Sequence, residues 1–292
     1  MAPHPVPVAL TIAGSDSGGG AGIQADLKTF HQFGVFGTSA VTAITVQNTL
    51  GVSAVHAVPL AIVRGQIDAV ASDLRPRALK TGMLATAELV RAVAEGIREH
   101  RLGGYVMDPV MVASSGDRLL EVDAETALVE HLFPLAALVT PNLHEASILT
   151  GVDVSDLEGM RRAARALVDM GAAAALVKGG HLAEADDAVD LLWDGSLERT
   201  WRRPRLASRS THGTGCTLSA AVAASLARGL PLDAAVERAV DFVWRAIAEA
   251  PGIGEGHGPV SHFVHTGLSA PDTADASRGA QGVTRGGPGR SG

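Results

Sequence analysis

The sequence predicts an α/β protein in which a mostly parallel sheet is covered by helices on both faces. Short apolar runs alternate along the chain with segments of helical length, and this alternation is typical of strands joined by crossover helices. The chain has 292 residues, of which 46% are hydrophobic, so it can bury one large core. The sequence indicates neither a fixed-period repeat nor a second core, and we expect one large domain.

Six short apolar runs are predicted to be the strands of this sheet. In chain order they are Val8 to Ala13, Ser39 to Val46, Ala78 to Lys80, Tyr105 to Met107, Ala136 to Thr140 and Ala173 to Val177. Strands connected by helices pair in parallel. Further along, Asp187 to Trp193 and Glu198 to Trp201 predict a hairpin turned by Asp194-Gly195.

Helical patterns occupy the intervals between these strands. We expect helices at about Ala21 to Phe33, Pro59 to Leu74, Thr86 to His100, Asp123 to His131, Asp156 to Met170, Gly215 to Ala227 and Leu232 to Ala250. The folded domain is predicted to span residues 8–265. Residues 1–7 alternate proline with small residues, and residues 266–292 are rich in Gly, Ser, Ala, Asp and Arg, so both ends are predicted to be disordered tails.

Composition excludes several classes of partner. The 31 acidic and 24 basic residues give a net charge of −7, and no basic stripe is present to follow a nucleic-acid backbone. No apolar run is long enough to cross a bilayer. The single cysteine allows no intrachain disulfide and fits a reducing compartment. We therefore expect a cytoplasmic protein that binds neither nucleic acid nor membrane.

The residues just after each strand are the candidate site, because ligands of such sheets gather at the carboxyl ends of the strands. The first strand is followed by the glycine-rich stretch Gly14 to Gly22, which leads into a helix carrying Gln24 and Asp26. No register of this stretch gives G-x-G-x-x-G, and no Gly-Lys-Ser/Thr follows. Its glycines indicate either a close approach to a ligand or a sharp structural turn.

Three further strand ends carry polar or polarisable side chains. Gln47 and Asn48 follow an apolar strand, and an amide can recognise a heteroaromatic edge, although Asn48 also suits a turn. Met83 comes shortly after Lys80, and core packing explains it equally well. Asp108 follows another strand, where an acid favours metal or nucleotide binding over helix capping.

The segment that follows Val139 combines a possible cap with a possible metal site. Asn142 and Glu145 are three residues apart and share one face of the first helical turn. This spacing is close to a capping box, and it also suits Mg²⁺, which prefers one or two carboxylates with phosphates. Lys178 ends another strand beside two glycines. A lysine there indicates phosphate binding only if other phosphate-binding groups lie nearby.

The run from Thr211 to Cys216 is the strongest single signal. It reads Thr-His-Gly-Thr-Gly-Cys and is followed by an apolar helical run from Thr217 to Ala224. The first amides of a helix have no partner within it, and the helix dipole adds positive charge there, so this loop predicts an anion site. A lone cysteine is usually a small core residue, but this context places Cys216 beside the transferred group.

Together these motifs resemble the ribokinase superfamily of small-molecule kinases and, within it, the hydroxymethylpyrimidine/phosphomethylpyrimidine kinases of thiamine biosynthesis. Seven stretches match in order: Ala9 to Phe30, Thr42 to Gly51, Lys80 to Leu84, Asp108 to Gly116, Thr140 to Gly151, Val177 to His181 and Thr211 to Ala221. The superfamily's N-x-x-E pattern corresponds to Asn142 to Glu145. Its G-A-G-D loop corresponds to Gly213 to Cys216, where cysteine replaces the usual aspartate base.

The resemblance implies a ribokinase-like three-layer αβα sandwich and an enzyme that uses ATP and Mg²⁺. The γ-phosphoryl group would pass to the hydroxymethyl group of 4-amino-5-hydroxymethyl-2-methylpyrimidine, and then a second one to the resulting monophosphate. A homodimer is also implied. By resemblance, the catalytic residues are Gly213, Thr214, Gly215, Cys216 and Lys178, the substrate residues are Asp26, Gln47, Met83 and Val110, the nucleotide residues are Asp108, Asn142, Lys178 and Thr211, and Glu145 serves the metal.

Three questions remain open at this point. We hypothesise that the helix N-terminus lowers the pKa of Cys216, so that its thiolate accepts the hydroxymethyl proton. One alternative function is a pyridoxal kinase, because pyridoxine also carries a hydroxymethyl group on a similar ring and the same loop occurs in that lineage. The other is a catalytically silent protein that binds thiamine precursors.

Overall fold

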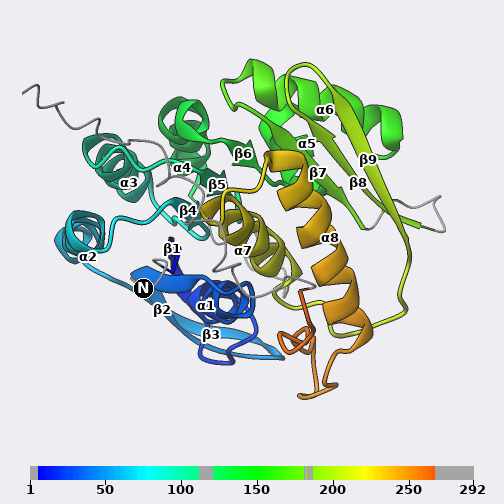
Figure 1. The fold of residues 1–292 in the computed structure, drawn as a ribbon, viewed down its shortest axis with the longest axis horizontal. Coiled ribbons are helices and arrows are strands. Elements are labelled where there is room, and N and C mark those ends of the chain that lie inside the picture. The colour runs from blue at the N-terminus through cyan, green and yellow to red at the C-terminus, as the bar shows by residue number, and fades with distance from the viewer. Residues whose placement is uncertain (1–5, 112–120, 181, 183–186, 267–292) are drawn as a thin grey trace, which may run out of the picture.

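The expected mostly parallel sheet forms the centre of the molecule (Figure 1). The computed structural model describes residues 6–111, 121–180, 182 and 187–266. Within these residues nine strands lie in the order β3-β2-β1-β4-β5-β6-β7-β8-β9. The strands are β1 (Val8–Ser15), β2 (Phe36–Asn48), β3 (Gly51–Ala57), β4 (Ala78–Thr81), β5 (Tyr105–Met107), β6 (Leu138–Val139), β7 (Ala175–Gly179), β8 (Asp187–Trp193) and β9 (Glu198–Pro204).

Strands β2, β1, β4, β5, β6 and β7 pair in parallel, whereas β3, β8 and β9 run antiparallel at the two ends of the sheet. The predicted hairpin is confirmed as β8 and β9. The sequence reading missed β3, and it ended the second strand at Val46, whereas β2 continues to Asn48. Gln47 and Asn48 therefore belong to the strand and do not follow it.

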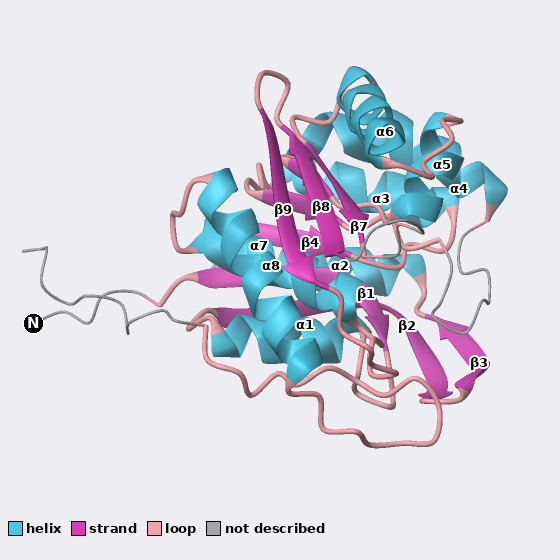
Figure 2. Ribbon diagram, turned by 90° about the vertical axis from the view of Figure 1, so that its right-hand side faces the viewer, coloured by secondary structure: helices cyan, strands magenta, loops and turns pink. Residues whose placement is uncertain are grey.

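Helices cover both faces of the sheet, as Figure 2 shows. They are α1 (Gly22–Gln32), α2 (Leu60–Asp73), α3 (Ala87–Glu99), α4 (Val122–Ala127), α5 (Leu143–Thr150), α6 (Leu157–Asp169), α7 (Thr214–Ala227) and α8 (Leu232–Ala248). The helix expected at Asp123 to His131 passes from α4 into a single π turn, Leu128–Leu132, and a 3₁₀ turn, Phe133–Leu135.

Two hydrophobic clusters fill the space between sheet and helices. Leu10 and Leu79 point to the cluster beneath α2, α3, α4 and α6, and their neighbours Ala9 and Ala78 point to the cluster beneath α1, α7 and α8. This alternation follows from the two-residue period of a strand, and a central strand is apolar because both of its faces are buried. The three-layer αβα architecture is thus confirmed.

The predicted domain boundaries stay predictions. Residues 1–5 and 267–292 lie outside the described residues, so of the two predicted tails the structure describes only residues 6, 7 and 266. No helix in the described ranges combines the length and apolarity that a membrane span requires.

Candidate active site at the carboxyl ends of the strands

Helix α7 meets the first glycine-rich loop at its N-terminus. Gly213 is the N-cap residue of α7 and has a φ of 83°. A Cβ atom on Gly213 would lie 1.8 Å from the carbonyl oxygen of Gly20, so this close crossing of two loops admits only glycine. The first turn of α7 thereby lies at the carboxyl end of β1, where amides without a partner inside the helix can bind a phosphate. The Thr214 N–H itself donates to Thr211 O at 3.3 Å.

Lys178 and Asp108 form an ion pair beside these amides. Lys178 lies in β7, Asp108 follows β5, and 3.0 Å separates Lys178 Nζ from Asp108 Oδ1. A Cβ atom on Gly215 would lie only 3.1 Å from Lys178 Nζ. Burial opposes the charge of Lys178, but the nearby carboxylates of Asp108 and Glu145 outweigh it and raise the pKa of the lysine. A permanent cation therefore faces the start of α7.

The predicted capping box at the start of α5 is confirmed. The Asn142 backbone N–H donates to Glu145 Oε2 at 2.8 Å, and the Glu145 N–H donates to Asn142 Oδ1 at 2.8 Å. Burial raises the pKa of Glu145 to about 7, with Lys178 acting in the opposite direction and Asp108 adding to the rise. Glu145 thus caps helix α5 and also lies close to Lys178 and Asp108. Its capping role is compatible with a role at the site.

Cys216 lies in the first turn of α7 and is half-buried. Burial raises the pKa of its thiol to about 11; Lys80 lowers it, whereas Asp26 and Asp108 raise it further. This raised pKa runs opposite to the lowered pKa that we hypothesised from the helix N-terminus. Desolvation disfavours the charged form more than the helix dipole favours it.

A fully buried ion pair lies near this thiol. Lys80 Nζ is 2.9 Å from both carboxylate oxygens of Asp26, and the Thr11 hydroxyl donates to Asp26 Oδ2 at 2.6 Å. Neither charged side chain has exposed surface. Burial opposes the charge of Lys80, but Asp26, Cys216 and Asp108 raise the pKa of the lysine. The carboxylate of Asp26 is thus occupied by Lys80 and Thr11.

The first glycine loop is organised around Asp16. Its Oδ1 accepts from the N–H of Gly18 at 2.8 Å, and its Oδ2 accepts from those of Gly20 and Ala21 at 3.0 and 2.8 Å. His212 Nε2 lies 2.9 Å from the same Oδ2. Burial acts to raise the pKa of Asp16, but these hydrogen bonds lower it below its ordinary value. Asp16 therefore links the glycine loop to the residue that precedes Gly213.

The remaining predicted residues lie around these groups. Met83 is buried, and its terminal methyl would be 2.8 Å from a Cβ atom on Gly14. Val110 is half-buried, and its N–H donates to Asp108 O at 2.8 Å. The Thr214 hydroxyl donates to Thr211 O at 3.1 Å. Met83 and Val110 thus follow β4 and β5 at the same edge of the sheet.

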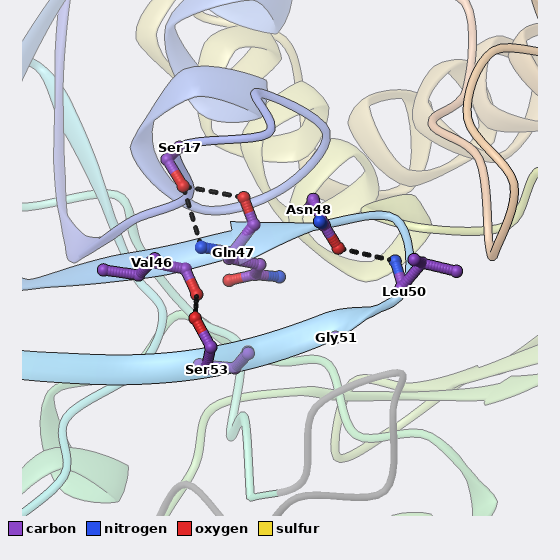
Figure 3. Close-up of a pocket in the computed structure, with 8 residues that line it drawn as sticks. Ser17, Val46, Gln47, Asn48, Leu50, Gly51 and Ser53 are labelled. Atoms are coloured by element: carbon purple, nitrogen blue, oxygen red, sulfur yellow. Dashed lines mark hydrogen bonds between the residues drawn. The ribbon is translucent and has the colours of Figure 1, made fainter.

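A pocket of about 510 Å³ opens at the β2–β3 hairpin (Figure 3). The lining residues are Ser17, Val46, Gln47, Asn48, Leu50, Gly51, Val52 and Ser53. The Ser17 hydroxyl donates to Gln47 O at 2.7 Å and accepts from Gln47 N at 2.8 Å, so the glycine loop is fastened to this strand. Of the predicted site residues, only Gln47 lines this pocket.

The structure thus brings together Lys178, Asp108, Glu145 and the start of α7, which are far apart in the sequence. Three further residues lie at the site without having been assigned a role from the sequence: Lys80, whose charge at a strand end was noted, Asp16 and His212. Each was visible at a strand end or in a glycine loop, but only the fold shows what each contacts. Among the described residues, no group of three or more His, Cys, Asp or Glu is placed to hold a metal ion.

Phosphoryl transfer depends mainly on amides and charged groups that are already in position around the terminal phosphate. The fold and these strand-end groups therefore define a small-molecule kinase. The family model described as Phosphomethylpyrimidine kinase matches residues 16–261. The chain belongs to this family, and the predicted class, a hydroxymethylpyrimidine/phosphomethylpyrimidine kinase of ribokinase-like fold, is confirmed.

Relatives and a solved structure support the assignment. The hydroxymethylpyrimidine/phosphomethylpyrimidine kinase of Bacillus subtilis is 50% identical over 255 residues, which are 87% of this chain and 94% of the relative. The thiamine biosynthesis bifunctional protein ThiED of Geobacter sulfurreducens is 52% identical over 94% of this chain, but the chain spans only 55% of that protein. The pyridoxal kinase of Staphylococcus aureus in complex with AMP-PCP and pyridoxal superposes with a TM-score of 0.82 and is 36% identical, covering 89% of this chain and 94% of its own.

Proposed function

We propose that the chain transfers the γ-phosphoryl group of ATP first to the hydroxymethyl group of 4-amino-5-hydroxymethyl-2-methylpyrimidine and then to the resulting monophosphate. One observation carries the proposal: the amides at the start of α7, the cation of Lys178 and the acids Asp108 and Glu145 converge at one edge of the sheet. The 50% identity to a kinase named for both acceptors supports the choice of substrate.

In this mechanism the protein supplies position and charge. The amides of Gly213, Thr214 and Gly215 would face the transferred phosphoryl group and stabilise the charge that develops on its oxygens. Lys178 stays protonated because two carboxylates lie beside it, and it balances phosphate charge at the same point. We assign Thr211 and Asn142 to nucleotide binding, because each lies in a loop next to these groups.

The acids beside Lys178 fit a bound Mg²⁺. Asp108 and Glu145 are both buried, and the charge of Asp108 contributes to the raised pKa of Glu145. Two carboxylates together with phosphate oxygens are the donors that this ion prefers, and when bound it would neutralise phosphate charge. Glu145 and Asp108 would hold it, and removal of divalent ions should abolish turnover.

On the substrate side, Gln47 would hydrogen-bond the pyrimidine edge, and Met83 and Val110 would pack on the ring. Asp26 acts indirectly, because its carboxylate is enclosed and holds Lys80. Burial raises the pKa of Cys216 to about 11, so we assign it a positioning role as a neutral thiol beside the acceptor oxygen. Comparable, small losses of both half-reactions in Cys216→Ala would support this role, whereas a large loss confined to the alcohol would restore the base.

Pyridoxal is the second candidate acceptor, because the similar S. aureus structure is a pyridoxal kinase. A coupled assay of ADP release should compare the pyrimidine alcohol, its monophosphate and pyridoxal, each with and without Mg²⁺. We expect turnover of both pyrimidines in the presence of Mg²⁺. Phosphorylation of pyridoxal alone would overturn the proposal, and binding of the pyrimidine without any turnover would favour a silent binding protein.

We also propose a homodimer and a reducing, cytoplasmic location. Ile44 and Val46 on β2 are 52% and 59% exposed, and the neighbouring β3 is an exposed edge strand. Apolar edges of this kind are usually covered by a partner, and a second copy of the chain is the occupant we propose. The free thiol of Cys216, the chain's one cysteine, fits a reducing compartment.

A further inference from the structure

His212 lies between the glycine loop and the strand that carries Gln47. Its Nε2 is 2.9 Å from Asp16 Oδ2 and 3.4 Å from the Nε2 of the Gln47 side-chain amide. The other end of that amide, Oε1, is 3.1 Å from the Thr45 hydroxyl. The Thr45 hydroxyl also lies 2.8 Å from Ser15 O. These contacts form a continuous chain from Asp16 to Ser15.

The carboxylate of Asp16 determines which nitrogen of the His212 ring carries a hydrogen. Asp16 is buried, and its pKa is held below the ordinary value, so its carboxylate accepts hydrogen bonds and donates none. A distance of 2.9 Å from this carboxylate requires a hydrogen on His212 Nε2. The ring nitrogen that faces Gln47 is therefore a donor.

The orientation of the Gln47 amide then follows from a count of donors. An amide NH₂ facing the N–H of His212 would set two donors against each other, so the amide oxygen must face His212. The Thr45 hydroxyl has one hydrogen, which it donates to Ser15 O at 2.8 Å, so it accepts from whatever faces it. After a half-turn of the amide, Nε2 donates to the Thr45 hydroxyl and Oε1 faces the N–H of His212. The one hydrogen on His212 Nε2 is then shared in a three-centre bond between Asp16 Oδ2, at 2.9 Å, and the amide oxygen.

We propose that Asp16 and His212 are specificity-positioning residues that fix which end of the Gln47 amide is donor and which is acceptor. The inference rests on the proposed function for the identity of the ligand. Once the two internal bonds are made, Oε1 keeps one lone pair and Nε2 keeps one hydrogen. A donor beside an acceptor matches a ring nitrogen beside an exocyclic amino group, the pairing by which glutamine reads adenine.

The same residue holds the phosphate loop. His212 directly precedes Gly213, its backbone N–H donates to Gly258 O at 3.1 Å, and its ring would contact a Cβ atom on Gly20 at 2.6 Å. The ring of His212 thus packs closely against the first glycine loop. The His212 side chain thereby contributes both to recognition of the pyrimidine edge and to placement of the anion-binding amides.

The kinetic test compares His212→Leu with His212→Gln, whose amide nitrogen can reach the position of Nε2. The substrates are the aminopyrimidine alcohol and its analogue without the 4-amino group. We expect the wild type and His212→Gln to prefer the aminopyrimidine, and His212→Leu to lose about 10- to 100-fold in kcat/KM for it, mainly through KM, with most of the preference gone. Equal losses on both substrates, or a loss in kcat alone, would overturn the proposal.

A second measurement does not depend on turnover. In ¹⁵N-labelled protein without ligand, the His212 signals, assigned by their disappearance in His212→Gln, should show a protonated Nε2 at neutral pH. An unprotonated Nε2 would overturn the assigned orientation even if every activity assay succeeded. If the wild type phosphorylates neither pyrimidine, the proposed function fails, while this spectrum still decides whether His212 orients Gln47.

Discussion

At the scale of single residues, the site shows burial and charge acting against each other. Cys216 stands at a helix N-terminus, a place that lowers a thiol pKa, yet its pKa is raised to about 11 because desolvation is the larger effect. Lys178 and Lys80 show the opposite balance, because in each case a carboxylate within 3.0 Å outweighs burial. The sequence could place the lysines at strand ends and Cys216 at a helix start. Whether burial or a neighbouring charge determines each pKa depends on distances that only the fold provides.

The thiol pKa leads to a prediction about alkylation. Because the chain has one cysteine, the rate of its reaction with iodoacetamide reports on Cys216 alone. We expect slow reaction at pH 7 and a rise of about tenfold per pH unit up to about pH 10, since only the thiolate reacts. The rate should be followed by mass spectrometry. A plateau reached below pH 8 would mean that the helix N-terminus dominates after all.

Lys178 gives a second prediction at this scale. Lys178→Met removes the cation that faces the start of α7, and we expect kcat to fall by about 10²- to 10³-fold, as for other groups that stabilise transition-state charge. Lys178→Arg is the matched control, because it keeps the charge and should recover part of the rate. Steady-state kinetics with the pyrimidine alcohol decides the point: a change confined to KM would show that Lys178 only binds the ground state.

At the scale of elements, the success of prediction follows the burial of each segment. The central strands and α7 are apolar because they are buried on every side, so the sequence shows them clearly. Strand β3 was missed because five of its seven residues are exposed and it has no apolar alternation. The extension of β2 to Asn48 was missed for the same reason, since its polar end is stabilised by pairing with β3.

The crossing of the two glycine loops is tested by a matched pair of alanine variants. Gly213 and Gly229 have nearly the same φ, 83° and 86°, but only Gly213 faces a backbone atom, at 1.8 Å, whereas nothing lies within 4 Å of a Cβ on Gly229. We expect Gly229→Ala to cost about 1 kcal/mol of unfolding free energy and to leave activity intact. Gly213→Ala should cost more and abolish most activity, because it separates the loops. Urea unfolding and kinetics measure both effects, and equal behaviour of the two variants would refute the argument.

The segment that follows α8 contributes a pH-dependent contact. His262 Nε2 lies 3.0 Å from the Thr217 hydroxyl of α7, and burial lowers the pKa of His262 from 6.5 to about 4. Between these values the unfolded chain binds the proton and the folded chain does not, so stability falls as the pH falls through this window.

We therefore expect the wild type to lose about 2 kcal/mol more unfolding free energy between pH 7 and pH 5 than His262→Gln, which can keep the contact with Thr217 but cannot titrate. Urea unfolding at both pH values measures this difference. If the two proteins lose the same free energy, protonation of His262 does not control this contact.

At the scale of the whole molecule, the site is assembled from segments that are far apart in the chain. The rule that ligands bind at the carboxyl ends of strands brought Lys178, Asp108 and Glu145 together correctly. It could not reveal the pair Asp16–His212, because the two residues are 196 positions apart and lie in two separate loops. Residues that position other residues can be identified only once the fold shows which loops lie side by side.

The exposed face of the β2–β3 hairpin leads to a prediction about assembly. Val46 is 59% exposed on this face, and Leu197, in the turn between β8 and β9 at the other end of the sheet, is 48% exposed. If two copies pair through the hairpins, Val46→Lys places a charge in an apolar contact and should yield monomers, because an unpaired charge is costly to bury. Leu197→Lys adds the same charge at the opposite edge and should leave the dimer intact. Light scattering coupled to size exclusion, over a range of concentrations, distinguishes the cases. A wild type that is monomeric throughout would remove the proposed dimer, and dissociation by Leu197→Lys alone would move the interface to the β8–β9 edge.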